Sequence, residues 1–314
     1  MGGTKILAAA INSQEGIIAR VKRPTPSSSN PNEYVKSLAE IIIKVVERLH
    51  LSKTNVKAVC LGIPGSLNPS TGKVGLAPNL GIKNFNIRKQ LKKFIPYPVL
   101  IENDVNLGAL GIKKFGAGKK AKNMLAVFIG TGIGGGLILN EKLYRGTNYV
   151  AGEIGHFPVE KNGPLCNCGN RGCFEAVASR TAIVRAILKD IKDGKKSVLK
   201  KYVKSKQRIK SKALSRAVSQ KDKVVVERLS EGCDTIGTVL ASVANLLNVD
   251  MIVLGGGVVE AMGNFMLPRI KESFSQHVMK DSSKGLKIVV SHLGDDAALY
   301  GGIALAEEFL SVKV

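Results

Sequence analysis

The sequence predicts an α/β protein built from two similar halves that face each other across a cleft. Its 314 residues suit two domains, and 44% hydrophobic residues with 34 glycines are typical of a globular chain. Segments 4–11 and 16–22 read as two strands around a turn, preceded by Gly-Gly-Thr at 2–4. Gly-Thr-Gly at 130–132 precedes a similar hairpin. Two glycine-led hairpins predict one structural unit used twice.

The remaining elements follow from local patterns. Apolar residues at helical spacing predict a helix from Asn32 to His50. Apolar runs that end in glycine or polar residues predict further strands within 56–65, 97–106, 124–139, 251–259 and after 286. Further helices are expected from 107 onward, over most of 174–247, and at the C-terminal end.

Nothing in the sequence predicts a membrane span or a secretory signal. No apolar run approaches the roughly 20 residues that cross a bilayer, and the short run after Lys5 is broken at Asn12. Five unevenly spaced cysteines argue against a disulfide scaffold and for a reducing compartment. We therefore expect a cytoplasmic protein in which Cys60 and Cys233 are buried thiols.

The formal charge of +23 raises the question of an anionic partner. Lysines are spread widely and are densest over 189–213. Aromatic residues make up only 5% of the chain, without tryptophan, so no basic–aromatic pattern for stacking bases is present. A lysine-rich solvated surface is the first interpretation, and contact with a polyanion is the alternative.

One short segment concentrates the cysteines and a histidine. His156, Cys166, Cys168 and Cys173 follow the pattern H-x9-C-x-C-x4-C. Three thiolates and one imidazole complete a tetrahedral zinc shell without an open position, so the sequence predicts a structural zinc site. Chance clustering or a redox pair is the alternative.

Two glycine-rich turns follow strands. The turn GTGIGGG at 130–136 offers backbone N–H groups that can hold phosphate, but it lacks the lysine of a P-loop and leads into a strand. The turn LGGGV at 254–258 suits a flat adenine or ribose close to the backbone. Tight turns required only for folding are the alternative for both.

Acidic and amide side chains mark a candidate polar site. Asn103 and Asp104 follow a strand end, where α/β proteins place ligand groups, and a carboxylate there can act as a general base. A helix N-cap is the equally weighted alternative. Glu153 and Glu175 flank the cysteine segment, which would fix both carboxylates in space. Together these residues suit a hydroxyl-rich ligand such as a sugar.

These segments together resemble the ROK family (repressor, open reading frame, kinase). GGTK, GIPG, APNL, END-x-N, GTGIGGG, AGEIGH, C-x-C-G-x-x-G-C-x-E and LGGGV occur here in the family's order across essentially the whole chain. The resemblance implies an actin-like, hexokinase-like ATPase fold with duplicated ribonuclease-H-like domains. It also implies a glucokinase-like enzyme that phosphorylates a hexose with ATP, Mg²⁺ and a structural Zn²⁺.

The resemblance assigns roles to individual positions. Asp104 would be the base that deprotonates the 6-hydroxyl, and His156 would bind zinc through one ring nitrogen and face the sugar with the other. The residues expected to bind the sugar are Gly65, Asn79, Asn103, Asp104, Glu153, His156 and Glu175. Those expected to contact the nucleotide are Gly2, Gly3, Thr4, Lys5, Gly130, Thr131, Gly132, Gly134, Gly255, Gly256 and Gly257.

The start of the sequence departs from the family. The family opens with a strand that ends in D-x-G-G-T-K, and here Met1 occupies the x position. We therefore expect the first strand and its aspartate to be missing, as in a shortened gene model whose true start lies upstream. A real loss would leave a non-catalytic sugar-binding protein as the function.

Neither the sugar nor the phosphoryl donor is fixed by these motifs. N-acetylmannosamine, N-acetylglucosamine or fructose could replace glucose, and polyphosphate could replace ATP. Repressors of the family carry a DNA-binding helix-turn-helix ahead of GGTK, and nothing precedes that motif here, so DNA is not an expected partner. We expect a homodimer or homotetramer whose smaller domain comprises 1–110 and 297–314, and whose larger domain comprises 111–296 and carries the zinc loop and the dimerisation helices.

Overall fold

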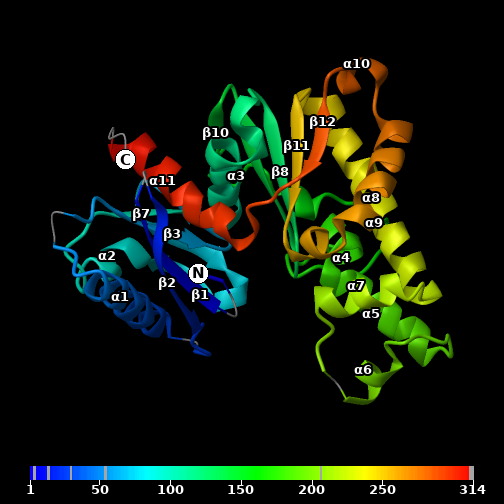
Figure 1. The fold of residues 1–314 in the computed structure, drawn as a ribbon, viewed down its shortest axis with the longest axis horizontal. Coiled ribbons are helices and arrows are strands. Elements are labelled where there is room, and N and C mark those ends of the chain that lie inside the picture. The colour runs from blue at the N-terminus through cyan, green and yellow to red at the C-terminus, as the bar shows by residue number, and fades with distance from the viewer. Residues whose placement is uncertain (3–4, 13–14, 29, 53–54, 206, 311–314) are drawn as a thin grey trace. The chain divides into compact units, whose positions relative to one another are not determined.

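The computed structural model describes residues 1–314 apart from 3–4, 13–14, 29, 53–54, 206 and 311–314. The chain divides into two compact units (Figure 1). Unit 1 comprises Met1–Lys119, Lys142–Ala151 and Asp295–Val314, and unit 2 comprises Lys120–Glu141 and Gly152–Gly294. Residues 111–119 and 142–151, which were expected in the larger domain, thus lie in unit 1. The domains predicted from the sequence remain a proposal.

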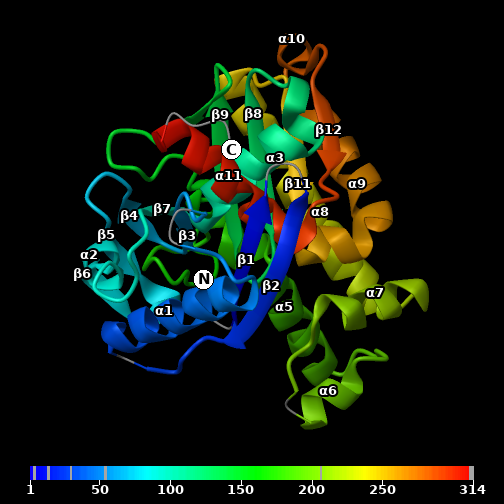
Figure 2. The same ribbon diagram turned by 60° about the vertical axis from the view of Figure 1, so that its left-hand side comes forward.

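Unit 1 begins with the expected hairpin and helix. Strands β1 (Lys5–Asn12) and β2 (Gly16–Pro24) pair antiparallel, with Lys5 opposite Pro24. Gly16 has a φ of 77°, which favours glycine at the end of the turn. Helix α1 (Pro31–Arg48) begins where the Asn30 side chain accepts the Asn32 N–H, and it packs on both strands (Figure 2).

The rest of unit 1 forms around two parallel strands. Strand β3 (Val59–Ile63) pairs with β7 (Val99–Asn103), while β4 (Ser66–Asn68), β5 (Lys73–Ala77) and β6 (Ile82–Asn86) form a small antiparallel sheet. The 3₁₀ turn η1 (Pro78–Leu80) and helix α2 (Ile87–Leu91) flank β6.

Among the described residues, β1–β2 and β3–β7 are two separate sheets. Ile6 of β1 nevertheless belongs to the same hydrophobic cluster as Leu61 and Ile63 of β3. The two sheets therefore share one hydrophobic core.

Helix α3 (Asp104–Phe115) and helix α11 (Ala297–Leu310) pack backbone against backbone in unit 1. A Cβ at Gly111 would lie 1.9 Å from the Ala297 carbonyl oxygen, and one at Gly301 would lie 1.9 Å from the Leu107 carbonyl oxygen. Glycine at both positions therefore sets how closely the C-terminal helix approaches α3.

The substitution Gly111→Ala is expected to destabilise the protein by about 1–3 kcal/mol, because the added methyl group must push the two helices apart. Urea unfolding measures this as a lower midpoint. Gly263→Ala is the control, since a Cβ at that glycine of α9 would meet only Val290 at 3.6 Å, an ordinary contact. Equal stability of both variants would contradict the close packing.

Unit 2 is built on β8 (Met124–Ile129), β9 (Ile133–Leu139), β11 (Met251–Gly255) and β12 (Lys287–Val290). Within unit 2 the sheet order is β9-β8-β11-β12, and the short strand β10 (Lys142–Tyr144) belongs to the residues of unit 1. β8 runs antiparallel to β9 and parallel to β11, and its apolar sequence reflects burial on both faces.

The rest of unit 2 consists mainly of helices. They are α4 (Phe174–Ala178), α5 (Arg180–Lys192), α6 (Lys200–Ser205), α7 (Ser211–Ser219), α8 (Lys223–Leu247), α9 (Gly257–His277) and α10 (Lys280–Ser283). The helical region predicted over 174–247 is confirmed, whereas α9, which contains Pro268 and departs from helical geometry at Met262, has no counterpart among the predicted helices. Among the described residues, no helix is both long and apolar enough to span a membrane.

Candidate functional site

A first candidate site lies in unit 1, where β7 ends and α3 begins. Asn103 is the N-cap: its side-chain oxygen accepts the N–H groups of Val105 at 2.8 Å and Asn106 at 3.2 Å. The helix therefore begins at Asp104, not at 107 as the sequence pattern predicted. The N-cap alternative holds for Asn103, which places Asp104 in the first helical turn.

Asp104 has the environment of a tunable carboxyl group. Burial raises the pKa of the Asp104 carboxyl above its ordinary range, while the Met1 ammonium and the Val105 N–H act in the opposite direction. A carboxyl group whose pKa is raised by desolvation is a stronger proton acceptor once it is ionised. Its position and its pKa are both compatible with a general base.

Gly65 lies beside this pair. Its carbonyl oxygen accepts the Asn103 side-chain N–H at 3.2 Å. Its φ is 93°, and a Cβ there would lie 2.2 Å from the Leu76 carbonyl oxygen, so only glycine fits. Asn79, the other sugar-binding residue predicted in this unit, is exposed in η1, and the hydrogen bonds of the described residues do not join it to Asn103.

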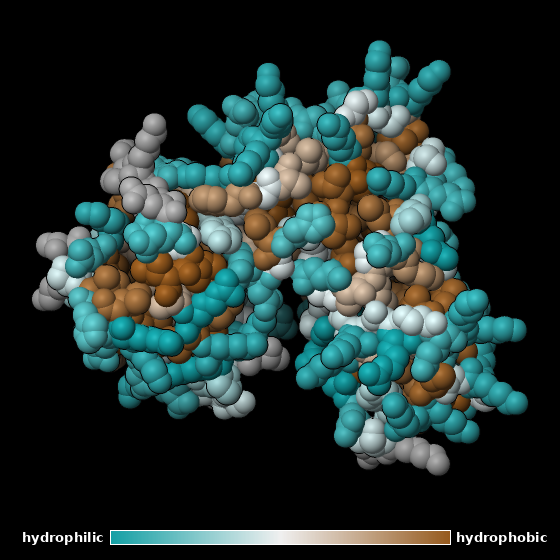
Figure 3. Space-filling model, in the orientation of Figure 1, coloured by the Kyte–Doolittle hydropathy of each residue, from teal (hydrophilic) through white to brown (hydrophobic). Residues whose placement is uncertain are grey.

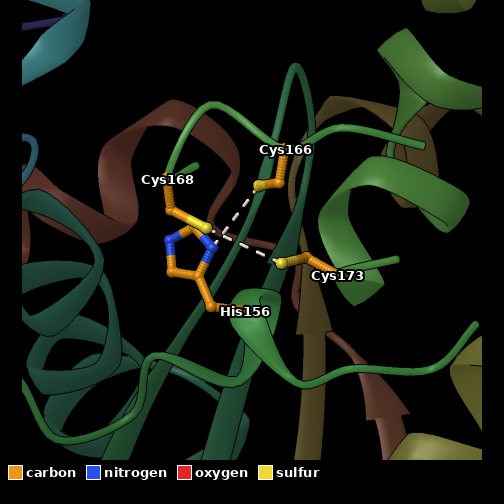
Figure 4. Close-up of side chains that lie close together, drawn as sticks. All are labelled: His156, Cys166, Cys168 and Cys173. Carbon is orange, nitrogen blue, oxygen red and sulfur yellow. Dashed lines mark hydrogen bonds between the residues drawn. The ribbon is translucent and has the colours of Figure 1, made fainter. Parts of the chain in front are cut away.

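A second candidate site, in unit 2, is the cysteine cluster. The ligand atoms of His156, Cys166, Cys168 and Cys173 all lie within 4.8 Å of one another (Figure 4). The Cys166 Sγ is 3.6 Å from His156 Nδ1, and the Cys168 and Cys173 sulfurs are also 3.6 Å apart. Four ligands at zinc distances of about 2.0–2.3 Å stand roughly 3.5–3.8 Å apart at the corners of a tetrahedron. The spacing therefore fits zinc and excludes a disulfide in this conformation.

The loop that holds the cluster is shaped by local backbone contacts. The Cys166 N–H donates to the Asn170 carbonyl at 2.8 Å, and the Gly169 N–H donates back to the Cys166 carbonyl at 3.0 Å. Gly172 has a φ of 67°, and a Cβ there would lie 1.7 Å from the Glu160 carbonyl oxygen. Burial raises the pKa of Cys173 to about 12, whereas the Asn170 N–H lowers that of Cys168. Zinc would supply the positive charge that stabilises all the thiolates.

The two acidic residues beside the cluster occupy different settings. Glu153 Oε2 lies 3.7 Å from His156 Nε2, so the imidazole presents Nδ1 to the sulfurs and Nε2 toward a carboxylate. Glu175 lies in α4, and its Oε2 accepts the Ile133 N–H at 2.9 Å. A Cβ at Gly132 would lie 2.0 Å from that oxygen. Glu175 thus follows the zinc-loop residue Cys173 closely in sequence and contacts the glycine turn that was predicted to bind phosphate.

Several glycines of unit 2 are needed for packing. A Cβ at Gly135 would lie 2.6 Å from the Gly152 carbonyl oxygen, and one at Gly155 would lie 2.1 Å from the Ile133 carbonyl oxygen. Gly256, with a φ of 90°, approaches the Ile129 backbone equally closely. The folding role of these turns is therefore established, and their nucleotide role remains a prediction.

The glycine turn between β8 and β9 has a partner that sequence reasoning missed. Arg180 donates a side-chain hydrogen bond to the Thr131 hydroxyl at 2.8 Å, and its N–H donates to the Gly130 carbonyl at 3.0 Å. Burial and the positive charge of Arg208 lower the pKa of Arg180. The one signal in the sequence was the position of Arg180 at the start of a helix directly after the cysteine segment.

The other residues that were predicted to contact the nucleotide are distributed over both units. The Gly2 N–H donates to the Lys5 carbonyl at 2.9 Å, and the Lys5 side chain forms an ion pair with Asp295. Gly3 and Thr4 lie outside the described residues. Gly255 ends β11, and Gly257 begins α9. Gly134 lies within β9.

Comparison with known proteins identifies the family. The ROK family model matches residues 1–309. A glucokinase from Halalkalibacterium halodurans is 33% identical over 303 residues, covering 96% of this chain and 92% of that protein. A xylose repressor from Caldicellulosiruptor bescii is 31% identical over 273 residues, covering 86% of this chain and 67% of the repressor. The structure of a ROK family glucokinase from Streptomyces griseus, in complex with glucose and AMPPNP, matches with a TM-score of 0.84 at 29% identity, over 98% of this chain and 97% of that one.

These matches confirm the predicted actin-like, hexokinase-like fold. The family model covers nearly every residue, and the glucokinase from S. griseus aligns from end to end at the level of structure. This chain therefore belongs to the ROK family.

Proposed function

We propose that this protein is an ATP-dependent hexose kinase that converts glucose to glucose 6-phosphate. The observation that carries the proposal is Asp104, a partly buried residue in the first turn of α3 whose carboxyl pKa is raised by desolvation, beside an asparagine that donates to the Gly65 carbonyl. Glucokinase relatives from H. halodurans and S. griseus, similar over almost the whole chain, support a sugar kinase.

The proposed reaction is a direct phosphoryl transfer. Asp104 accepts the proton of the sugar 6-hydroxyl, the hydroxyl oxygen bonds to the γ-phosphorus of ATP, and ADP leaves with the electrons of the broken P–O bond. Mg²⁺ bound with ATP would neutralise charge on the phosphates. The protein's own contribution is to hold the hydroxyl, the base and the phosphate in line.

In this proposal the sugar hydroxyls are bound by the residues that the family resemblance implies: Asn103, Asn79 and the Gly65 backbone, together with Glu153, His156 and Glu175. Zinc would fix the His156 ring through Nδ1. Zinc is structural in this role, because its four protein ligands leave no position for a reacting water.

The nucleotide is assigned to glycine-rich backbone. The turn around Gly130, Thr131 and Gly132, with Gly134 and the N-terminal residues Gly2, Gly3, Thr4 and Lys5, would bind phosphates. Gly255, Gly256 and Gly257 would line the adenosine pocket. We also propose that the protein is cytoplasmic and that it forms a homodimer or homotetramer.

A different phosphoryl donor is the second candidate, and a specific charge pattern favours it. Eleven of the 28 residues from Gly194 to Lys221 are lysine or arginine and none is acidic. Figure 3 shows mostly hydrophilic side chains over α6 and α7, which belong to this segment. Arg180 donates a hydrogen bond to the turn that was predicted to bind phosphate, and burial and the positive charge of Arg208 lower the pKa of Arg180. A linear polyphosphate is the donor that such a basic surface would favour.

A coupled ADP-release assay with ATP and Mg²⁺ tests the first proposal. The panel contains glucose, fructose, N-acetylglucosamine and N-acetylmannosamine, because the same polar residues serve several hexoses. Glucose is expected to give the highest kcat/KM. A second series measures glucose 6-phosphate directly with polyphosphate in place of ATP. Sugar binding without turnover by either donor would favour a sugar sensor, such as the related xylose repressors, over a kinase.

A further inference from the structure

Glu102 is a buried carboxylate directly before Asn103, a predicted sugar-binding residue, and Asp104, the predicted base. It is 1% exposed. Its Oε1 accepts the backbone N–H of Asn103 at 2.9 Å and the Asn106 side-chain N–H at 3.0 Å. Its Oε2 accepts Arg145 Nε at 2.6 Å. Both oxygens are therefore engaged, and they hold the residues on each side of Asp104.

Arg145 extends this contact to the C-terminal helix. Its two terminal nitrogens donate to the two carboxylate oxygens of Glu308, at 2.8 and 3.1 Å. Its guanidinium carbon also lies 5.6 Å from the centre of the Phe309 ring. Arg145 is only 15% exposed, although the Glu308 side chain of this planar, bidentate pair is 42% exposed. One guanidinium group thus connects the end of β7 to the last turn of α11.

We propose that Glu102 and Arg145 are positioning residues for phosphoryl transfer, because they fix the strand end and the helix cap from which Asp104 projects. The proposal rests on the kinase function inferred above and adds residues to it. The Glu102 network, defined as Glu102, Asn106, Arg145 and Glu308, contains no residue predicted to touch sugar or nucleotide. It acts on the reaction only through the placement of Asp104.

The buried Glu102 carboxylate has little conformational freedom, because both of its oxygens accept hydrogen bonds. Without Arg145, Glu102 must protonate or turn toward water, since an unpaired buried charge is strongly unfavourable. Either change weakens its hold on the Asn103 N–H and the Asn106 side chain. A displacement of about 1 Å at a reacting group can lower the rate about 100-fold, even when binding residues stay in place.

The test uses three variants: Glu102→Gln, Arg145→Lys and Arg145→Met. Glu102→Gln preserves the shape of the side chain. Its amide N–H either faces Arg145 Nε, which is itself a donor, or replaces the oxygen that accepts the Asn103 N–H. We expect kcat to fall about 10–100-fold in Glu102→Gln and Arg145→Met, with the KM for sugar changed less than threefold. Arg145→Lys keeps the charge but not the forked geometry, and it is expected to recover part of kcat.

The matched control is Arg228→Met in unit 2. Arg228 pairs with the largely buried Asp190 at 2.7 and 2.9 Å and with Glu231, which repeats the two-carboxylate geometry away from the candidate site. We expect this variant to lose thermal stability while its kcat at 25 °C stays unchanged. If Arg145→Met behaves in the same way, the pair is only structural and the proposal is wrong.

Amide deuterium exchange over residues 99–107 gives a readout without turnover. Faster exchange there in Glu102→Gln and Arg145→Lys, but not in Arg228→Met, is the expected result, and unchanged exchange would overturn the proposal. A wild-type protein without kinase activity would instead reject the proposed function, and the exchange data would still decide the role of the network. If Arg145→Met does not fold, the other two variants carry the test.

Discussion

Replacing Asp104 with asparagine is expected to lower kcat by about 10²–10⁴-fold, the usual contribution of a general base. The amide keeps the size of the carboxyl group and leaves the α3 N-cap at Asn103 intact, so the helix should still form. The KM for sugar should change only a few-fold, because deprotonation of the 6-hydroxyl is required for the transfer step and not for binding. Steady-state kinetics on purified protein measures both constants.

The pH profile gives a second measurement of the same carboxyl group. The pKa of Asp104 is raised, chiefly by burial, so the group is protonated and inactive over more of the acid range than an exposed aspartate. In the wild type, kcat/KM should therefore fall on the acid side with a midpoint above the ordinary aspartate value of about 3.9. This limb should disappear in the residual activity of Asp104→Asn.

The control is Asp281→Asn, which changes an exposed aspartate in the short helix α10. It should retain wild-type kcat and the wild-type acid limb. A catalytic rate for Asp104→Asn within threefold of wild type would show that another group accepts the proton.

The sequence was most informative where the signal is local. A polar turn between two β-rich runs predicted the β1–β2 hairpin, and helical spacing of apolar residues predicted α1 to within two residues at each end. The cysteine segment is also local. Its ligands span 18 residues from His156 to Cys173, and its glycines permit the tight loop that gathers them. Because the ligands are close in the sequence, their residue types and their spacing together predict a metal-binding loop.

Contacts between distant segments could not be read in the same way. Glu102 and Arg145 are 43 residues apart, and nothing in either neighbourhood marks the other as its partner. The glycines of β9 read as phosphate-binding residues, yet Gly135 is needed because the Gly152 backbone packs against it. The start of α3 was placed too late because the pattern could not decide between a strand end and a cap at Asn103. These features depend on tertiary packing, which composition and periodicity do not encode.

Removal of zinc is expected to affect sugar binding more than the transfer step. The four ligand atoms all lie within 4.8 Å of one another, and the same loop carries Glu153 and leads directly into Glu175. Without the metal, the thiolates repel one another or protonate, and the His156 ring loses the contact that orients it. The protein should contain one zinc per chain, and chelation should raise the KM for glucose by at least tenfold.

Variants separate the metal site from cysteine chemistry in general. Cys166→Ser should lose zinc and show the same increase in KM, since it removes one of the four ligands. Cys233→Ala is the control, because this buried thiol lies in α8 and outside the ligand cluster, and it should retain both zinc and KM. Zinc-free protein with an unchanged KM would contradict the assignment of the loop as part of the sugar site.

Substitution of cobalt for zinc decides what the metal does. Co²⁺ accepts the same tetrahedral sulfur and nitrogen ligands, so a metal that only shapes the loop should restore KM with kcat within a few-fold of the zinc form. A metal that takes part in the transfer would change kcat with its identity. The four protein ligands available to the metal, together with the proposal that Asp104 of the other unit is the base, predict the first result.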